Sequence, residues 1–148
     1  MRVVVQRVKE ASCCVSGEIT GSINEGFLLF IGYRTGDTLE DEDKMLRKIA
    51  GLRVFEDEAG KMNKSLNDIN GSILAISQFT LYADCKHGNR PSFTEAMKFD
   101  EANNRYLDFC KKLENKGFKV EKGIFGADMK ISLINDGPVT IILDSDFL

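Results

Sequence analysis

Histidine, proline and tryptophan are scarce in this sequence, which has one histidine, two prolines and no tryptophan among 148 residues. Its four cysteines are Cys13, Cys14, Cys85 and Cys110, and no two of them have the Cys-x-x-Cys spacing of a zinc-binding pair. His87 is the one imidazole. We therefore expect neither a zinc site nor a histidine-dependent nucleophile, and we interpret the cysteines as reduced, small hydrophobic residues.

Long apolar runs and low-complexity segments are also missing. The longest apolar run, Phe27 to Ile31, has the length of a strand and is too short to cross a bilayer. The opening residues reach Gln6 and Arg7 too early for a signal peptide. Hydrophobic residues make up 43%, charged residues 29%, and the net charge is −3, values typical of a soluble globular protein. This composition predicts a cytoplasmic protein with a single domain over residues 1–148.

Short extended segments separated by turn residues follow one another along most of the chain. The hairpin-type turn signals are Ser16-Gly17 and Asn70-Gly71. The expected strands are Val3 to Val8, Ala11 to Val15, Glu18 to Ile23, Phe27 to Ile31, Leu52 to Phe55, Ser72 to Tyr82, Val120 to Phe125, Met129 to Ile134 and Val139 to Leu143.

Two segments have the apolar periodicity of helices. The first follows Thr38, a capping residue with Asp41 three positions later, and Gly51 is expected to end it in a left-handed conformation. The second runs from Asp100 to Lys116, and Gly117 stops it. Hairpins without regular strand–helix alternation predict an α+β fold, in which a largely antiparallel, curved or barrel-like sheet packs with two main helices.

Polar residues also occur where a strand pattern does not require them. Ser77, Gln78 and Thr80 follow the apolar residues Ile73 to Ile76. This strand end either presents hydroxyl and amide groups to a ligand or simply reaches the surface.

Two further segments have alternative interpretations. The general rarity of cis bonds predicts a trans bond in the turn Gly137-Pro138, whereas a cis bond would make it a fixed corner. The basic loop Lys86 to Phe93 and the basic stretch Lys111 to Lys122 either contact phosphates or are solvated surfaces.

Four motifs together resemble the D-aminoacyl-tRNA deacylase family, which includes D-tyrosyl-tRNA deacylase. They are Ser77 to Asp84, Gly88 to Phe93, Phe125 to Met129 and Asn135 to Thr140, and the opening Met1 to Val8 is similar to that of the family as well. The resemblance covers essentially the whole chain in order.

This resemblance implies an enzyme of translation quality control. It would hydrolyse the ester between a D-amino acid and the 3′-terminal adenosine of tRNA, and would also clear glycine from mischarged tRNA. The resemblance implies a homodimer that needs no cofactor or metal and does not bind membranes, with a cis Gly137-Pro138 reaching into the partner's site. By the same resemblance, the catalytic residues are Ser77, Gln78, Phe79 and Thr80, and the substrate-binding residues are Gly137, Pro138 and Arg7.

Hydrolysis is plausible without a catalytic histidine, because an aminoacyl ester is already activated. The backbone N–H near Phe79, with Ser77 and Gln78, would stabilise the developing oxyanion. Since the motif offers no base for Thr80, we prefer a water nucleophile assisted by the adenosine 2′-hydroxyl. Arg7 either holds the Gly-Pro corner through hydrogen bonds or is a surface charge on an edge strand.

Two other classes of function stay open on the sequence. A non-enzymatic module that binds an RNA end or a peptide would share the basic loop, but it would not need the polar strand end beside a Gly-Pro corner. A general serine esterase is the weaker alternative, because the sequence lacks a Gly-x-Ser-x-Gly motif and a usable histidine.

Overall fold

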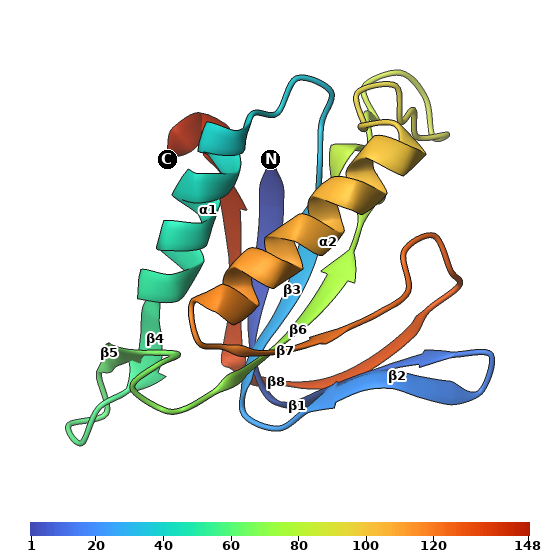
Figure 1. The fold of residues 1–148 in the computed structure, drawn as a ribbon. Coiled ribbons are helices and arrows are strands. Elements are labelled where there is room, and N and C mark those ends of the chain that lie inside the picture. Colours follow the sequence, from blue (N-terminus) through green and yellow to red (C-terminus); the bar gives the residue numbers. More distant parts are fainter.

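The fold combines one large sheet, a small hairpin and two long helices, in a computed structural model that describes residues 1–148 (Figure 1). In chain order the elements are β1 (Arg2–Val15), β2 (Glu18–Ile23), β3 (Gly26–Gly32), α1 (Leu39–Gly51), β4 (Arg53–Glu56), β5 (Met62–Ser65), β6 (Ser72–Ser77), the 3-10 helix η1 (Phe79–Tyr82), α2 (Phe99–Asn115), β7 (Lys119–Lys122), β8 (Lys130–Asp144) and the 3-10 helix η2 (Ser145–Phe147). None of these helices is both long and apolar enough to span a membrane.

The long strand β1 organises the main sheet. It pairs antiparallel with β8 along almost its whole length, and antiparallel with β2 and β3. Outward from β3, the pairs β3–β6 and β6–β7 are parallel. At Gly21 in β2, a Cβ would lie 2.9 Å from the carbonyl oxygen of Lys122, so the sheet rolls until β2 and β7 almost meet. The predicted α+β fold with a barrel-like sheet is confirmed, and the two parallel pairings make that sheet mixed.

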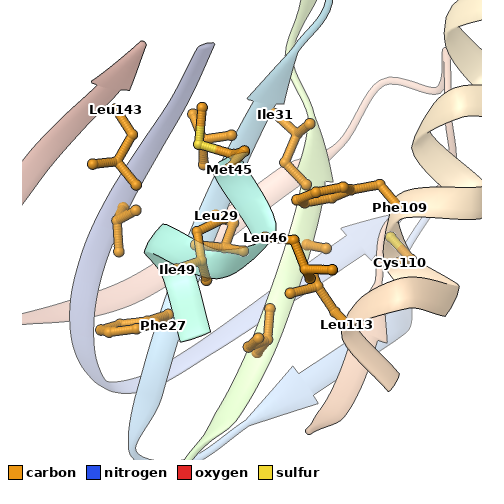
Figure 2. Close-up of a cluster of buried hydrophobic side chains, with 14 of the residues drawn as sticks. Phe27, Leu29, Ile31, Met45, Leu46, Ile49, Phe109, Cys110, Leu113 and Leu143 are labelled. Carbon is orange, nitrogen blue, oxygen red and sulfur yellow. The ribbon is translucent and has the colours of Figure 1, made fainter. Parts of the chain in front are cut away.

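Both long helices pack on one face of this sheet and bury a common core (Figure 1). The run Phe27 to Ile31 in β3 is buried as expected for a central strand, apart from half-buried Phe30. Figure 2 shows how this core is assembled from β3, α1, α2 and β8. The side chains labelled there are Phe27, Leu29, Ile31, Met45, Leu46, Ile49, Phe109, Cys110, Leu113 and Leu143.

A buried ionic contact connects the two helices. Glu42 of α1 is completely buried, and it accepts hydrogen bonds from Arg105 and, at 2.9 Å, from Lys112, both on α2. A buried carboxylate is tolerated when it is paired and hydrogen-bonded in this way. This contact fixes α2 relative to α1, and therefore relative to the sheet.

The first helix begins as predicted but ends differently. Thr38 and Asp41 form a capping box, in which each side chain accepts a hydrogen bond from the other's backbone N–H. The expectation of a left-handed Gly51 is wrong, since Gly51 is the last helical residue and its φ is not positive. The helix ends because Leu52 is extended and leads directly into β4, with its side chain packed against the core.

Four strand predictions need correction. The two strands expected at 3–8 and 11–15 are one continuous element, β1. The segment expected from Ser72 to Tyr82 is a strand to Ser77 and then turns into η1. The two strands expected at 129–134 and 139–143 are one element, β8, because both halves pair with the same strand β1 across a register shift. The strand expected from Val120 to Phe125 ends at Lys122, and the chain beyond it forms a loop.

Candidate functional site

A cavity of about 560 Å³ opens where the parallel strands β3 and β6 end. Ile31 of β3 lies level with Ser77 of β6, so the carboxyl ends of both strands meet at this edge of the sheet. Most of the lining is apolar. The large side chains around the cavity are Tyr33, Phe79, Phe93, Met97, Phe99, Phe125 and Met129.

The polar groups of the cavity come mainly from the strand end identified in the sequence. Ser77, Gln78 and Phe79 line the cavity, whereas Thr80 is exposed and lies outside the lining. The backbone N–H of Gln78 donates to the carbonyl of Ile31 at 2.7 Å, and the chain then turns into η1. The Gln78 side-chain amide donates to Thr80 Oγ1 at 2.5 Å. No other side chain forms a hydrogen bond with the Thr80 hydroxyl, so no general base is positioned to activate it.

Two residues outside the motif hold η1 in place. Arg2 donates to the carbonyl of Leu81 at 2.7 Å, and its guanidinium lies 4.9 Å from the centre of the Tyr82 ring. Burial raises the pKa of Tyr82, whose hydroxyl has no hydrogen-bond partner. Gly32 lets η1 approach β3, because a Cβ there would lie 2.9 Å from the Gln78 carbonyl oxygen. Sequence reasoning missed both Arg2 and Gly32, since their partners are distant in the chain.

The segment Phe125 to Met129 also lines the cavity. Gly126 has a φ of +77°, and a Cβ there would lie 2.6 Å from the Phe99 ring. Phe99 in turn packs edge-to-face on Phe125, with ring centroids 4.9 Å apart. The sequence motif Phe125 to Met129 supported the family resemblance but was not assigned to the site. The sequence feature that could have assigned it to the site is a glycine between two apolar residues in a loop.

A second aromatic pair lies at the rim. Phe79 and Phe93 contact edge-to-face with their centroids 5.0 Å apart, and both rings are more than a third exposed. Exposed aromatic faces beside an apolar cavity are suited to stacking against a planar ligand.

The Gly137-Pro138 corner lies on β8, and its peptide bond is cis, as the family resemblance implies and contrary to the trans bond that general frequencies predict. Arg7 is 6% exposed, so its interpretation as a surface charge is wrong. It donates to the carbonyl of Asp136 at 2.9 Å and to that of Val54 at 2.5 Å. These bonds tie the corner to β1 and β4.

Within one chain, this corner and the cavity are separate. Gly137 lies beside the part of β1 that contains Gln6 and Val8, whereas Ser77 is level with Ile31 and hence with Val3. Four or five residues along the strands and three strand spacings correspond to roughly 20 Å. Neither Gly137 nor Pro138 lines the cavity of its own chain.

The two basic segments differ in their ion pairs. In the stretch from Lys111 to Lys122, four of the five lysines lie within 4 Å of a carboxylate, the exception being Lys116. In the loop between η1 and α2, Lys86 and Arg90 are exposed and form no ion pair. Lys98, just before α2, is also exposed and forms no ion pair. The cations beside the cavity are therefore free, whereas most of the other cluster is neutralised.

Fold and cavity together define a class: an α+β protein with one aromatic-rimmed pocket, whose polar groups come mainly from a single strand end. The chain belongs to the D-Tyr-tRNA(Tyr) deacylase family, whose family model matches residues 4–144.

Several known proteins are similar over nearly the whole length. D-aminoacyl-tRNA deacylases from Lactobacillus gasseri and Exiguobacterium sibiricum are 56% and 57% identical over 144 residues, which cover 97% of this chain and 99% of each relative. A solved structure titled c-Myc DNA unwinding element binding protein is 42% identical, with a TM-score of 0.91, and the match covers 97% of this chain and 98% of that one. A probable eukaryotic D-amino acid tRNA deacylase has a TM-score of 0.80 over 96% of this chain and 97% of its own, and at 15% identity it supports the fold alone.

Proposed function

We propose that this protein hydrolyses the ester between a D-amino acid and the 3′-terminal adenosine of tRNA, releasing the free D-amino acid and tRNA. As a member of its family the chain is an enzyme, a hydrolase that acts on aminoacyl-tRNA. Its role is then chiral proofreading in translation. We further propose that it works in the cytoplasm and that residues 1–148 form one deacylase domain.

The observation that carries the proposal is the cavity at the end of β6. Its volume is in the range of pockets that bind small molecules and cofactors, and its apolar, aromatic lining suits a nucleoside base. Ser77 and Gln78 provide polar groups on the same wall, where an ester attached to that nucleoside would lie. One pocket can thus hold the last nucleoside of tRNA and the reacting carbonyl together.

Stabilisation of the oxyanion is the main catalytic contribution that these residues offer. The N–H groups of Phe79 and Thr80 begin the short helix η1, and the first N–H groups of a helix have no partner within it. They are available to a carbonyl oxygen that becomes negative in the transition state, with Ser77 and Gln78 beside it.

The nucleophile in this mechanism is water. The Thr80 hydroxyl accepts a hydrogen bond from Gln78 and has no base to take its proton, so it supports the Gln78 amide and does not attack. The neighbouring 2′-hydroxyl of the substrate adenosine assists the water. The reaction as written requires ester and water alone.

Chirality is selected by exclusion. We propose a homodimer in which Gly137-Pro138 of one subunit borders the cavity of the other, close to the α-carbon of the substrate. There the backbone leaves room for hydrogen but not for the side chain of an L-amino acid. The same geometry would admit glycine, so glycyl-tRNA is an expected second substrate. Arg7 is the residue that holds this corner in position.

Incubation with D-Tyr-tRNA and L-Tyr-tRNA tests the function directly. We expect rapid release of D-tyrosine and survival of the L-ester, monitored by acid-precipitable label. Loss of both esters at equal rates would contradict chiral selection. Loss of neither would favour the alternative, a module that binds an RNA end or a peptide without hydrolysing it.

A further inference from the structure

The loop between η1 and α2 carries a group of cations whose arrangement points to a ligand outside the cavity. Lys86, Arg90 and Lys98 are all exposed, and no carboxylate lies within 4 Å of any of them. The chain has a net charge of −3, and most of its other cations are ion-paired. Three of the eight cations without an ion pair lie on this one loop, and in a chain with more acidic than basic side chains this is a local feature that the overall charge does not reveal.

This loop is fixed to the cavity at its base. Asp84 and Ser92 form two backbone hydrogen bonds of 2.8 and 2.9 Å, which close the loop. The next residue, Phe93, lines the cavity, and so does Met97, which precedes Lys98. A seven-residue loop closed in this way places no α-carbon more than about 14 Å from its base. The loop therefore lies beside the cavity, next to the start of α2 (Figure 1).

Carboxylates near this loop form no ion pair with its three cations. Glu95 is the one carboxylate between Lys86 and Lys98, so residues 86–98 have a net charge of +2. Asp84 accepts the backbone N–H of Lys86, and Asp128, which lines the cavity, pairs with Lys130. Asp100 and Glu101 follow Lys98 in the first turn of α2 and do not pair with these cations. The positive charge of residues 86–98 thus lies next to the exposed aromatic pair of Phe79 and Phe93.

We propose that Lys86, Arg90 and Lys98 bind the phosphates of the single-stranded 3′ end of tRNA, immediately before the nucleoside that enters the cavity. Free cations next to aromatic faces are the combination with which proteins hold single-stranded nucleic acid. The lysine cluster from Lys111 to Lys122 does not take part, since carboxylates already occupy most of it. This inference rests on the proposed function and assigns the tRNA contacts of that same site.

The test compares two triple variants that remove the same amount of charge. The first replaces Lys86, Arg90 and Lys98 with Gln. The matched control replaces Lys111, Lys116 and Lys119, which are also exposed. Each protein is assayed for binding of uncharged tRNA at 50 and 200 mM salt, for hydrolysis of D-Tyr-tRNA, and for hydrolysis of 2′(3′)-O-D-tyrosyl-adenosine, which has no phosphate.

The first variant should bind tRNA more weakly at 50 mM salt and should lose much of its salt dependence. Removing three phosphate contacts makes the negative slope of log K against log salt shallower by about 2. The loss of tRNA affinity relative to wild type should therefore be about 20-fold larger at 50 mM than at 200 mM salt. KM for D-Tyr-tRNA should rise in parallel with unchanged kcat. Hydrolysis of the adenosine ester should be unchanged, and the control variant should behave as wild type in every assay.

An equal loss of tRNA binding in both variants would overturn the proposal, because net charge alone would then explain it. Wild-type tRNA binding and salt slope in the first variant would overturn it as well. The proposed function would be contradicted by a different result, namely that the wild-type protein hydrolyses neither ester. In that event the tRNA-binding measurements still decide whether the loop holds tRNA.

Discussion

At the scale of single residues, Gly137 has a φ of +138° and almost no free space beside its α-carbon. A Cβ there would lie 2.8 Å from Val139 Cγ2 and 3.0 Å from a terminal nitrogen of Arg7. Asn135 reinforces the corner, because its side-chain oxygen accepts the N–H of Val139 at 2.8 Å. Any side chain at position 137 therefore strains the backbone and pushes against the arginine that holds it.

Gly137→Ala should consequently reduce both stability and activity. The strained backbone costs about 1–3 kcal/mol of unfolding free energy. A displaced corner should lower kcat/KM for D-Tyr-tRNA by about 100-fold, because errors near 1 Å at a site have effects of this size. Urea unfolding and the deacylation assay measure the two effects.

Gly60→Ala is the matched control for this substitution. Gly60 also has a positive φ, +74°, but no atom lies within 4 Å of its added Cβ. It should lose stability without losing activity. Normal D-ester hydrolysis and normal L-ester rejection by Gly137→Ala would mean that the corner is only a turn.

At the scale of elements, the approach of η1 to β3 depends on Gly32. A methyl group at this position would meet the carbonyl of Gln78 at 2.9 Å and Leu81 Cβ at 3.1 Å. Gly32→Ala should shift η1 and lower kcat about tenfold or more, with a stability cost of about 1–3 kcal/mol. Gly51→Ala is the control, since nothing lies within 4 Å of its Cβ. Unchanged kcat in Gly32→Ala would show that catalysis does not depend on the position of η1.

The start of α1 predicts a pH dependence of stability. Hydrogen bonds from Thr38, first from its backbone N–H, hold the pKa of Asp41 below its ordinary value. Because the folded pKa is the lower one, Asp41 stabilises the protein fully above its unfolded pKa of about 3.9, and this stabilisation disappears as the pH falls through the folded value.

Asp41→Asn should therefore be less stable than wild type by about 1 kcal/mol at neutral pH. The difference should shrink below pH 4, as measured by urea unfolding from pH 7 to pH 2.5. Asp108→Asn, on the exposed face of α2, should show no such convergence. A gap for Asp41→Asn that stays constant with pH would contradict the role of its charge.

At the scale of the whole molecule, the Gly137-Pro138 corner is too far from the cavity of its own chain to border it. The proposed function therefore requires that a second chain supply the corner. β8 pairs with β1 on one edge only, and Ile134 and Ile142 on it are 53% and 67% exposed. An open edge strand with exposed apolar side chains is a natural surface for association. Sedimentation should give twice the 16.5 kDa mass of one chain.

Mixed dimers provide a sharper test of the shared site. Ser77→Ala and Gly137→Ala each impair both sites of their own homodimer. In a mixed dimer, the Gly137→Ala chain contributes an intact Ser77 and its partner an intact Gly137, so one of two sites recovers. Random mixing should restore about a quarter of wild-type activity. No recovery, or a fully active monomer, would rule out a cross-subunit site.

Local features could be predicted from the sequence, because the free energies that control them are local. Thr38 with Asp41 defined the start of α1, the apolar spacing after Asp100 defined the buried face of α2, and the run Phe27 to Ile31 defined a buried strand. Each depends on residues a few positions apart. The motif at 77–80 was recognised in the same way, from neighbouring polar residues and their family resemblance.

The tertiary structure alone decided where these pieces meet. The parallel pairing of β3 with β6 brings Ser77 to a cavity that the distant segment Phe125 to Met129 also lines, and no local pattern encodes that pairing. Likewise, Arg7 is buried because Asp136 and Val54, more than 40 residues away, accept its hydrogen bonds. Contacts between distant segments depend on the packing free energy of the whole sheet and its helices, which no short segment of sequence contains.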